Sequence, residues 1–159
     1  MRLEYESLGL IRSPYQDLEG MPIQPSGAKG ERGRIEMEPQ YEPGLSDLDG
    51  FSHLILLYHF HLVTEPELKV TPFLDQQPRG IFATRAPKRP NPIGLSVVEL
   101  ISVEGSVLHI QDVDILDRTP ILDLKPYVPE FDQAEGARTG WLQRAALQVD
   151  QARSDSRFR

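Results

Sequence analysis

Basic side chains gather in one short stretch of an otherwise acidic chain. Segment 76–98 contains no acid, whereas the whole chain has a formal net charge of -7. A desolvated cluster of positive charge attracts phosphate or carboxylate groups, so this stretch predicts a site for an anionic ligand. The alternative is a solvated turn that binds nothing. The cationic residues are Arg79, Arg85, Lys88 and Arg89.

Prolines make this basic segment stiff. Pro87, Pro90 and Pro92 fix their own φ and disfavour the helical region for the residues before them, so APKRPNP is predicted to be an extended loop. The β-branched run LSVVELISV follows it and predicts a strand. The loop is therefore expected at the edge of a sheet.

Carboxylates form the second group that could do chemistry. Asp112, Asp114 and Asp117 end one apolar run, and Thr119-Pro120 begins the next. Carboxylates at a strand end accept hydrogen bonds from hydroxyl or ammonium groups of a ligand, and equally they cap turns. Both interpretations are open from the residues alone.

Histidines suggest a metal site, which the spacing does not support. On a strand over Phe51–Val63, the period of two places His53, His59 and His61 on one face. No pattern such as HExxH follows, so we expect histidines of the core or of a ligand pocket and no metal.

The elements that must position these residues are mostly strands. Residues 16–34 lack a hydrophobic period and predict a long loop, while Phe51–Val63 is apolar enough to be buried on both faces. The last residues, 153–159, are expected to fray. Further strands are expected at Leu3–Ile11, Arg34–Met37, Gly80–Thr84 and Ile121–Leu124, a hairpin at Leu95–Val103 and Val107–Leu116, and a helix over residues 143–153.

Length and composition favour one β-rich domain. The 159 residues suit a single core, and 14 prolines and 12 glycines between short apolar runs favour strands with structured loops. The absence of cysteine excludes disulfides and thiolate chemistry. No apolar run approaches the roughly 20 residues of a membrane helix and no signal peptide is visible, so we expect no membrane association and a cytoplasmic location.

Several separate motifs together resemble one family. ATRAPKRPNPIGLSVVEL and LDRTPILDLKPYVP, with GLIRSPY and FSHLILLYHFH before them, resemble the signature segments of the TsaA-like, or TrmO, family. The resemblance covers roughly residues 7 to 130. It implies a compact β-barrel domain over residues 1–135 with long loops, and a short helical tail over residues 136–159. It also implies a homodimer.

The family resemblance implies a methyltransferase. Its cofactor would be S-adenosyl-L-methionine and its substrate the N6 atom of the threonylcarbamoylated adenosine-37 of tRNA. The residues implied to contact the cofactor are Pro25, Ser26, Gly27, His61, Leu62, Arg85, Leu95, Asp114, Ile115, Leu116 and Asp117.

Roles in the reaction are hypotheses built on this resemblance. Methyl transfer is a direct displacement, so the protein must hold the acceptor nitrogen in line and accept its proton. Asn91 is the candidate for orienting the amine, and Asp114 or Asp117 for accepting the proton. The candidates for RNA phosphate contacts are Arg12, Lys88, Arg89 and Lys125.

Departures from the family pattern and two rival functions accompany the resemblance; one departure is Leu62, where some relatives have a polar residue. Arg118 stands where similar sequences often have glycine, and some relatives carry a further C-terminal domain, which leaves substrate choice open. One rival is a non-catalytic sensor that binds S-adenosylmethionine or RNA. The other is a methyltransferase for a small-molecule or protein acceptor. The acidic net charge suits this function better than RNA binding, because general affinity for RNA depends on positively charged side chains.

Overall fold

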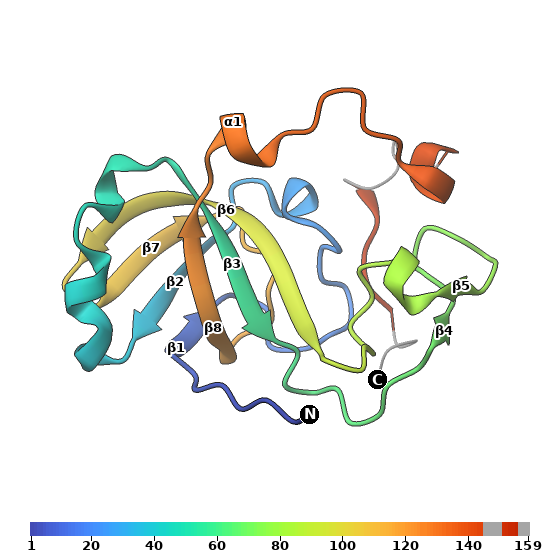
Figure 1. Cartoon of the computed structure of the whole chain (residues 1–159), viewed down its shortest axis with the longest axis horizontal. Coiled ribbons are helices and arrows are strands. Elements are labelled where there is room, and N and C mark those ends of the chain that lie inside the picture. The colour runs from blue at the N-terminus through green and yellow to red at the C-terminus, as the bar shows by residue number, and fades with distance from the viewer. Residues whose placement is uncertain (145–150, 156–159) are drawn as a thin grey trace.

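The main element is a closed barrel of six antiparallel strands (Figure 1). The computed structural model describes residues 1–144 and 151–155. Strand order is β1-β2-β7-β6-β3-β8, and β8 pairs with β1 to close the barrel. The prediction of a mainly β, barrel-like fold is confirmed. The barrel strands are β1 (Gly9–Arg12), β2 (Arg32–Met37), β3 (His53–His59), β6 (Ile93–Glu104), β7 (Val107–Gln111) and β8 (Thr119–Pro126).

The strands alternate between the barrel core and the outer surface. In β3, Leu54, Leu56 and Tyr58 are buried, and the residues between them are half-buried. The expectation that this segment is buried on both faces was wrong, because a closed barrel packs only the inward side of each strand. The fully buried core contains Ile11, Ile35, Leu54, Leu56, Val98, Leu108, Ile110, Val113 and Ile121.

The predicted hairpin is confirmed, with a shorter second strand. Gly105, at φ 59°, turns the chain between β6 and β7. Strand β7 ends at Gln111 because Asp112 adopts φ 65° and directs the chain away from the sheet. The acidic segment 112–117 is therefore a loop at the end of the barrel.

The first strand also begins later than predicted. It runs over Gly9–Arg12, where it pairs with β2 from Met37 back to Arg34 and with β8 from Ile121 back to Thr119. Before it, residues 1–8 form no strand, and Leu3 and Tyr5 are exposed.

A small lobe lies beside one end of the barrel (Figure 1). It contains the two-stranded sheet β4 (Lys69–Val70) and β5 (Arg79–Gly80), followed by the 3-10 helix η4 (Ile81–Ala83). Val70, Ile81 and Ala86 form its own core. The strand predicted over Gly80–Thr84 was wrong, because the Thr84 amide and hydroxyl both donate to the Ile81 carbonyl and close a helical turn.

Further short helices complete the described structure, together with a segment near the C-terminus in which Arg153 forms a β-bridge with Pro22. The helices are η1 (Pro25–Ala28), η2 (Pro39–Leu45), η3 (Leu48–Gly50), α1 (Pro129–Asp132) and η5 (Gly140–Arg144). The helix predicted over residues 143–153 falls largely on 145–150, outside the described residues. Within the described ranges, no helix is long and apolar enough to cross a membrane. The division into a barrel over 1–135 and a tail over 136–159 stays a prediction.

Arg118 has a backbone conformation that glycine favours, which gives a physical reason for glycine in similar sequences. Its φ is 63° and its side chain is exposed. Arg118→Gly is expected to raise the free energy of unfolding by about 0.5–1 kcal/mol, because the left-handed conformation strains residues with a Cβ. Urea denaturation would measure this. Arg32→Gly, in an extended strand, should instead lower stability, and a loss at both positions would contradict the assignment of strain to Arg118.

Candidate functional site

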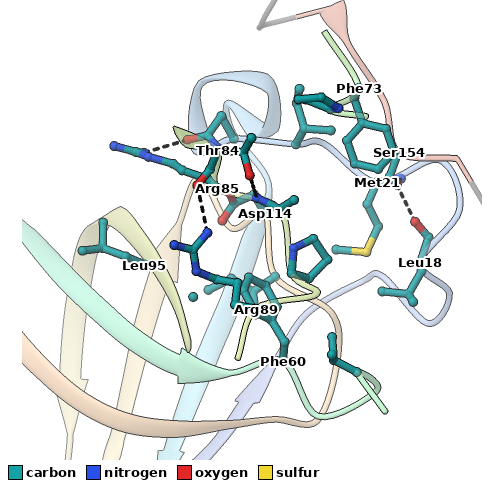
Figure 2. A pocket seen from close by; sticks show the side chains of 18 of the residues that line it. Leu18, Met21, Phe60, Phe73, Thr84, Arg85, Arg89, Leu95, Asp114 and Ser154 are labelled. Atoms are coloured by element: carbon teal, nitrogen blue, oxygen red, sulfur yellow. Dashed lines mark hydrogen bonds between the residues drawn. The ribbon is translucent and has the colours of Figure 1, made fainter. Parts of the chain in front are cut away.

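A cavity of about 770 Å³ opens between the end of the barrel and the lobe. Tyr58, Phe60 and Gly94 line it from the barrel, and Phe73 and Phe82 from the lobe. Figure 2 shows Arg85, Arg89 and Asp114 toward one side of this cavity, and Met21 and Ser154 toward the other. Its volume is in the range of sites for nucleoside-sized ligands.

The structure brings most of the predicted cofactor residues together around this cavity. Of the predicted residues, two that follow β3, two from the basic loop and the start of β6, and three from the acidic loop 112–117 line it. Segments that are far apart in the sequence therefore meet at one place. The predicted residues in the lining are His61, Leu62, Arg85, Leu95, Asp114, Ile115 and Leu116.

The other predicted cofactor residues lie outside the cavity lining. Pro25, Ser26 and Gly27 belong to η1, and it is Gln24 before them that lines the cavity. The Asp117 carboxylate accepts the Ser13 N–H at 3.1 Å and lies 4.0 Å from Arg12 Nη1. In this structure Asp117 therefore caps a turn of the chain, the alternative that its position after a strand had left open.

Of the acids predicted from the sequence, Asp114 is the one that lines the cavity. Its Oδ1 accepts a hydrogen bond from the Ser96 hydroxyl at 2.7 Å. Burial raises the pKa of Asp114 to about 6, although the Ser96 hydrogen bond and the positive charge of Arg85 both act to lower it. A carboxylate with a pKa close to neutral can both accept and release a proton under ordinary conditions.

Two arginines of the basic loop have different environments. The Arg85 side chain is exposed and donates to Gln24 Oε1 at 3.0 Å, so it reaches across the cavity to the loop after β1. Arg89 donates to the carbonyls of Ile81 and Thr84 at 3.2 and 2.8 Å, and its guanidinium lies 5.8 Å from the Phe82 ring centroid. Arg89 thus holds η4 in place, whereas Arg85 is available to an anionic ligand group.

The four cations proposed for RNA do not form one free basic surface. Arg12 pairs with Glu36 at 2.8 Å, Lys88 with Glu67 at 2.7 Å and Lys125 with Asp123 at 2.6 Å. Arg89 is occupied by backbone carbonyls, as described above. To bind an RNA phosphate, each of these side chains would have to break its present contact. The geometry therefore gives no support to the prediction that they bind RNA.

Asn91 lies outside the cavity lining and is exposed to solvent. Its main-chain carbonyl accepts the Ile93 N–H at 2.8 Å, which turns the chain into β6. The geometry thus gives Asn91 a role in the loop, and its proposed role in orienting the substrate amine stays a prediction.

The prediction that His53, His59 and His61 share one face of a strand was wrong, because β3 ends before His61. His53 and His59 lie at the two ends of β3, whereas His61 follows the strand and lines the cavity. His61 Nδ1 is 3.4 Å from the Thr119 hydroxyl, and burial lowers the pKa of His61. Among the described residues, no group of three or more His, Asp or Glu side chains is arranged to hold a metal ion.

Sequence reasoning missed part of the cavity wall near the C-terminus. The Trp141 indole N–H donates to the Ala83 carbonyl at 2.8 Å, and the Arg79 guanidinium lies 5.6 Å from its ring centroid. The Ser154 hydroxyl accepts the Met21 N–H at 2.8 Å and donates to the Leu18 carbonyl. The prediction that residues 153–159 fray was therefore wrong for Ser154, which also forms backbone hydrogen bonds with Gly20 and Met21. No local pattern signals these contacts, although Trp141 is an isolated aromatic in a polar segment.

The raised pKa of Asp114 predicts a pH-dependent stability. The ordinary value is 3.8 and the folded value about 6, so the folded chain binds this proton more tightly than the unfolded chain. The free energy of unfolding therefore falls as pH rises from about 4 to 6. Asp114→Asn is expected to remove this decline and to be about 1–3 kcal/mol more stable than wild type at pH 7. Urea unfolding at pH 4, 5, 6 and 7 would measure both chains, and parallel pH profiles would contradict the raised pKa.

Comparison with known proteins decides the family. Residues 10–133 match the family described as the tRNA-methyltransferase O N-terminal domain. The chain belongs to the TrmO family. Solved TrmO structures share its fold: one described as the crystal structure of TrmO superposes with a TM-score of 0.77 at 41% identity, over 88% of this chain and 64% of that one. TrmO from Pseudomonas aeruginosa gives 0.75 at 38% identity, over 89% and 63%.

Two curated relatives of this chain have different kinds of name. A probable S-adenosyl-L-methionine-binding protein of Pyrococcus abyssi is 50% identical over 97% of this chain and 84% of its own length. The tRNA (adenine(37)-N6)-methyltransferase of Escherichia coli K12 is 36% identical over 89% of this chain and 65% of its own length. This chain thus spans under two thirds of the bacterial enzyme and of the solved TrmO chains.

Proposed function

We propose that this chain binds S-adenosylmethionine in the cavity and transfers its methyl group to N6 of adenosine-37 in tRNA. The names of the relatives agree with the cofactor predicted from the sequence. The observation that carries the proposal is the position of Asp114, a carboxylate of near-neutral pKa, in the wall of a cavity built on a TrmO-family barrel.

The lining residues fit such a cofactor in chemistry as well as in size. The wall is mainly apolar and aromatic, as an adenine ring requires, and charged groups of both signs lie within it: Arg85, Arg89, Asp114 and Asp155. Arg85 is suited to the carboxylate of the methionine part, and Asp114 to an ammonium group or to a proton of the acceptor amine. The cofactor, when bound, supplies an activated methyl group.

The residues of the chain then have three tasks. The apolar wall excludes water, Arg85 orients the ligand, and the Asp114 carboxylate accepts the proton that the exocyclic amine loses. An exocyclic adenine amine is a poor nucleophile because its lone pair is delocalised into the ring. A nearby proton acceptor therefore contributes to the rate directly.

The test is methyl transfer from isotopically labelled S-adenosylmethionine to tRNA. The full chain is incubated with an unmodified transcript or with threonylcarbamoylated tRNA, and the digested nucleosides are separated by mass spectrometry. We expect label on N6 of adenosine-37, and a loss of kcat/KM of at least about tenfold between 50 and 200 mM salt. Label on a small molecule or protein, without salt dependence, would favour the other acceptor class.

A non-catalytic binding module is the second candidate, favoured by the name of the Pyrococcus abyssi relative. It predicts calorimetric binding of S-adenosylmethionine by the wild type with no methyl transfer to any tRNA tested. Binding together with transfer would exclude it. No binding at millimolar cofactor would argue against both candidates and leave the cavity to another ligand.

We also propose a homodimer that covers the cavity mouth. Phe82 is 75% exposed, and three other apolar side chains of the lining, Leu62, Leu95 and Ile93, are between 40% and 53% exposed. Apolar groups gathered at one opening commonly mark an interaction surface. Light scattering should give twice the chain mass, and Phe82→Glu should reduce it to the monomer. A monomeric wild type at micromolar concentration would contradict this proposal.

A further inference from the structure

A buried chain of hydrogen bonds links the barrel core to the cavity. Tyr58 on β3, Ser96 on β6 and Asp114 after β7 lie in contact: Tyr58 Oη is 3.0 Å from Ser96 Oγ, which is 2.7 Å from Asp114 Oδ1. Tyr58 is 6% exposed and Ser96 2% exposed. Burying a hydroxyl without a hydrogen-bond partner costs free energy, so these hydrogen bonds stabilise the buried arrangement of Tyr58 and Ser96.

The direction of each hydrogen bond follows from the number of protons. A carboxylate only accepts, so the single Ser96 hydroxyl proton is donated to Asp114. The contact between Tyr58 and Ser96 must then use the tyrosine proton. Burial raises the pKa of Tyr58, which keeps that proton in place. Each donation polarises the next, and the chain ends on Asp114 Oδ1.

Besides a hydrogen bond from its own backbone N–H, the Asp114 carboxylate has Ser96 as its side-chain partner among the described residues. Among the described residues, no side-chain donor lies within hydrogen-bond distance of Oδ2, and Asp114 belongs to the lining. Ser96 is on the inward face of β6 and Tyr58 on the paired strand β3, so both partners are fixed by the barrel itself. Asp114, in a loop, is therefore held by rigid elements.

We propose that Ser96 and Tyr58 are positioning residues that fix Asp114 with Oδ1 against the barrel and Oδ2 toward the substrate amine. This inference rests on the proposed function. As the bond from the acceptor nitrogen to the methyl carbon forms, the bond from that carbon to sulfur breaks and its electron pair stays on sulfur. The nitrogen then loses one proton, which Oδ2 accepts.

Few other charged or titratable groups act on Asp114. Arg85, in the basic loop, is a positive charge that favours the carboxylate, and Tyr15, in the segment after β1, is neutral at ordinary pH but feels the Asp114 charge. Neither takes part in the hydrogen-bonded chain. Ser96 is thus the side chain whose removal should change the ionisation of Asp114 without altering any charge.

The test combines carboxyl NMR titration of the full chain without ligand and pH profiles of single-turnover methyl transfer. In wild type the Asp114 titration and the acid limb of the rate should have the same midpoint. Ser96→Ala should raise both by about half to one pH unit, because a donor to the charged form is lost. Tyr58→Phe leaves the Ser96 donor and should raise both by less. Ser96→Thr keeps a hydroxyl and should restore the wild-type values.

Several results would overturn the inference. An Asp114 titration that is unchanged in both Ser96→Ala and Tyr58→Phe would show that these residues do not tune the carboxyl. A titration that moves while the acid limb of the rate does not would show that Oδ2 is not the proton acceptor. If the wild type transfers no methyl group, the proposed function and the acceptor role fail, while the titration still decides whether Ser96 and Tyr58 position Asp114. Tyr58→Phe keeps the packed ring, so it provides the comparison if Ser96→Ala does not fold.

Discussion

Asp114→Asn should lower the single-turnover rate of methyl transfer by about 10² to 10⁴-fold at saturating S-adenosylmethionine. Asparagine has nearly the same shape and its Oδ1 still accepts the Ser96 hydrogen bond, but it takes up no proton at neutral pH. Rapid quenching with labelled cofactor measures the rate, and calorimetry measures cofactor affinity separately. A large loss of rate with affinity kept within about tenfold would assign the effect to proton transfer.

Asp112→Asn is the matched control. Asp112 lies two residues away, outside the cavity lining, and its Oδ1 accepts the Gly30 N–H at 2.7 Å. Its φ of 65° suits asparagine, which tolerates the left-handed region better than most residues. This variant should keep its rate within about twofold of wild type. A similar rate loss in both variants would argue for a general effect of charge in this loop and against a role specific to Asp114.

Gly94→Ala should damage both the barrel and the cavity. A Cβ at this position would lie 2.2 Å from Tyr58 Cε2 and 2.5 Å from Cζ, far inside contact distance. The Tyr58 ring has little freedom to move, because it bonds to Ser96 and packs edge-on against Phe60 with ring centroids 5.4 Å apart. We expect a loss of about 1–3 kcal/mol in the free energy of unfolding.

Gly94→Ala should also narrow the cavity. Gly94 and Tyr58 both line it, so a displaced tyrosine ring narrows the cavity and breaks the contact with Ser96. Cofactor affinity is expected to fall at least tenfold. Urea denaturation and calorimetry measure the two effects. Gly44→Ala, where no atom lies within 4 Å of the new Cβ, should leave both unchanged; wild-type values at position 94 would contradict the close contact.

Local sequence determined the elements whose signals are short-range. The apolar, β-branched run in Leu95–Val103 and the glycine turn after it predicted the β6–β7 hairpin, and the long motifs around Arg85 and Asp114 identified the family and part of the cavity wall. The signal was weaker where one pattern fits two structures. Gly80–Thr84 looks like a strand, but a side-chain hydrogen bond from Thr84 makes it helical.

Tertiary structure alone decided which residues meet. Nothing in the sequence separates Asp114 from Asp117, yet burial next to Ser96 makes the first a cavity acid, and pairing with Ser13 and Arg12 makes the second a turn cap. In the sequence, Ser96 is one hydroxyl in an apolar strand. Only the pairing of β6 with β3 places Tyr58 beside it and gives it a partner. Motifs fix residue types and local backbone, whereas pKa values, hydrogen-bond partners and access to a cavity depend on neighbours that only the closed barrel brings together.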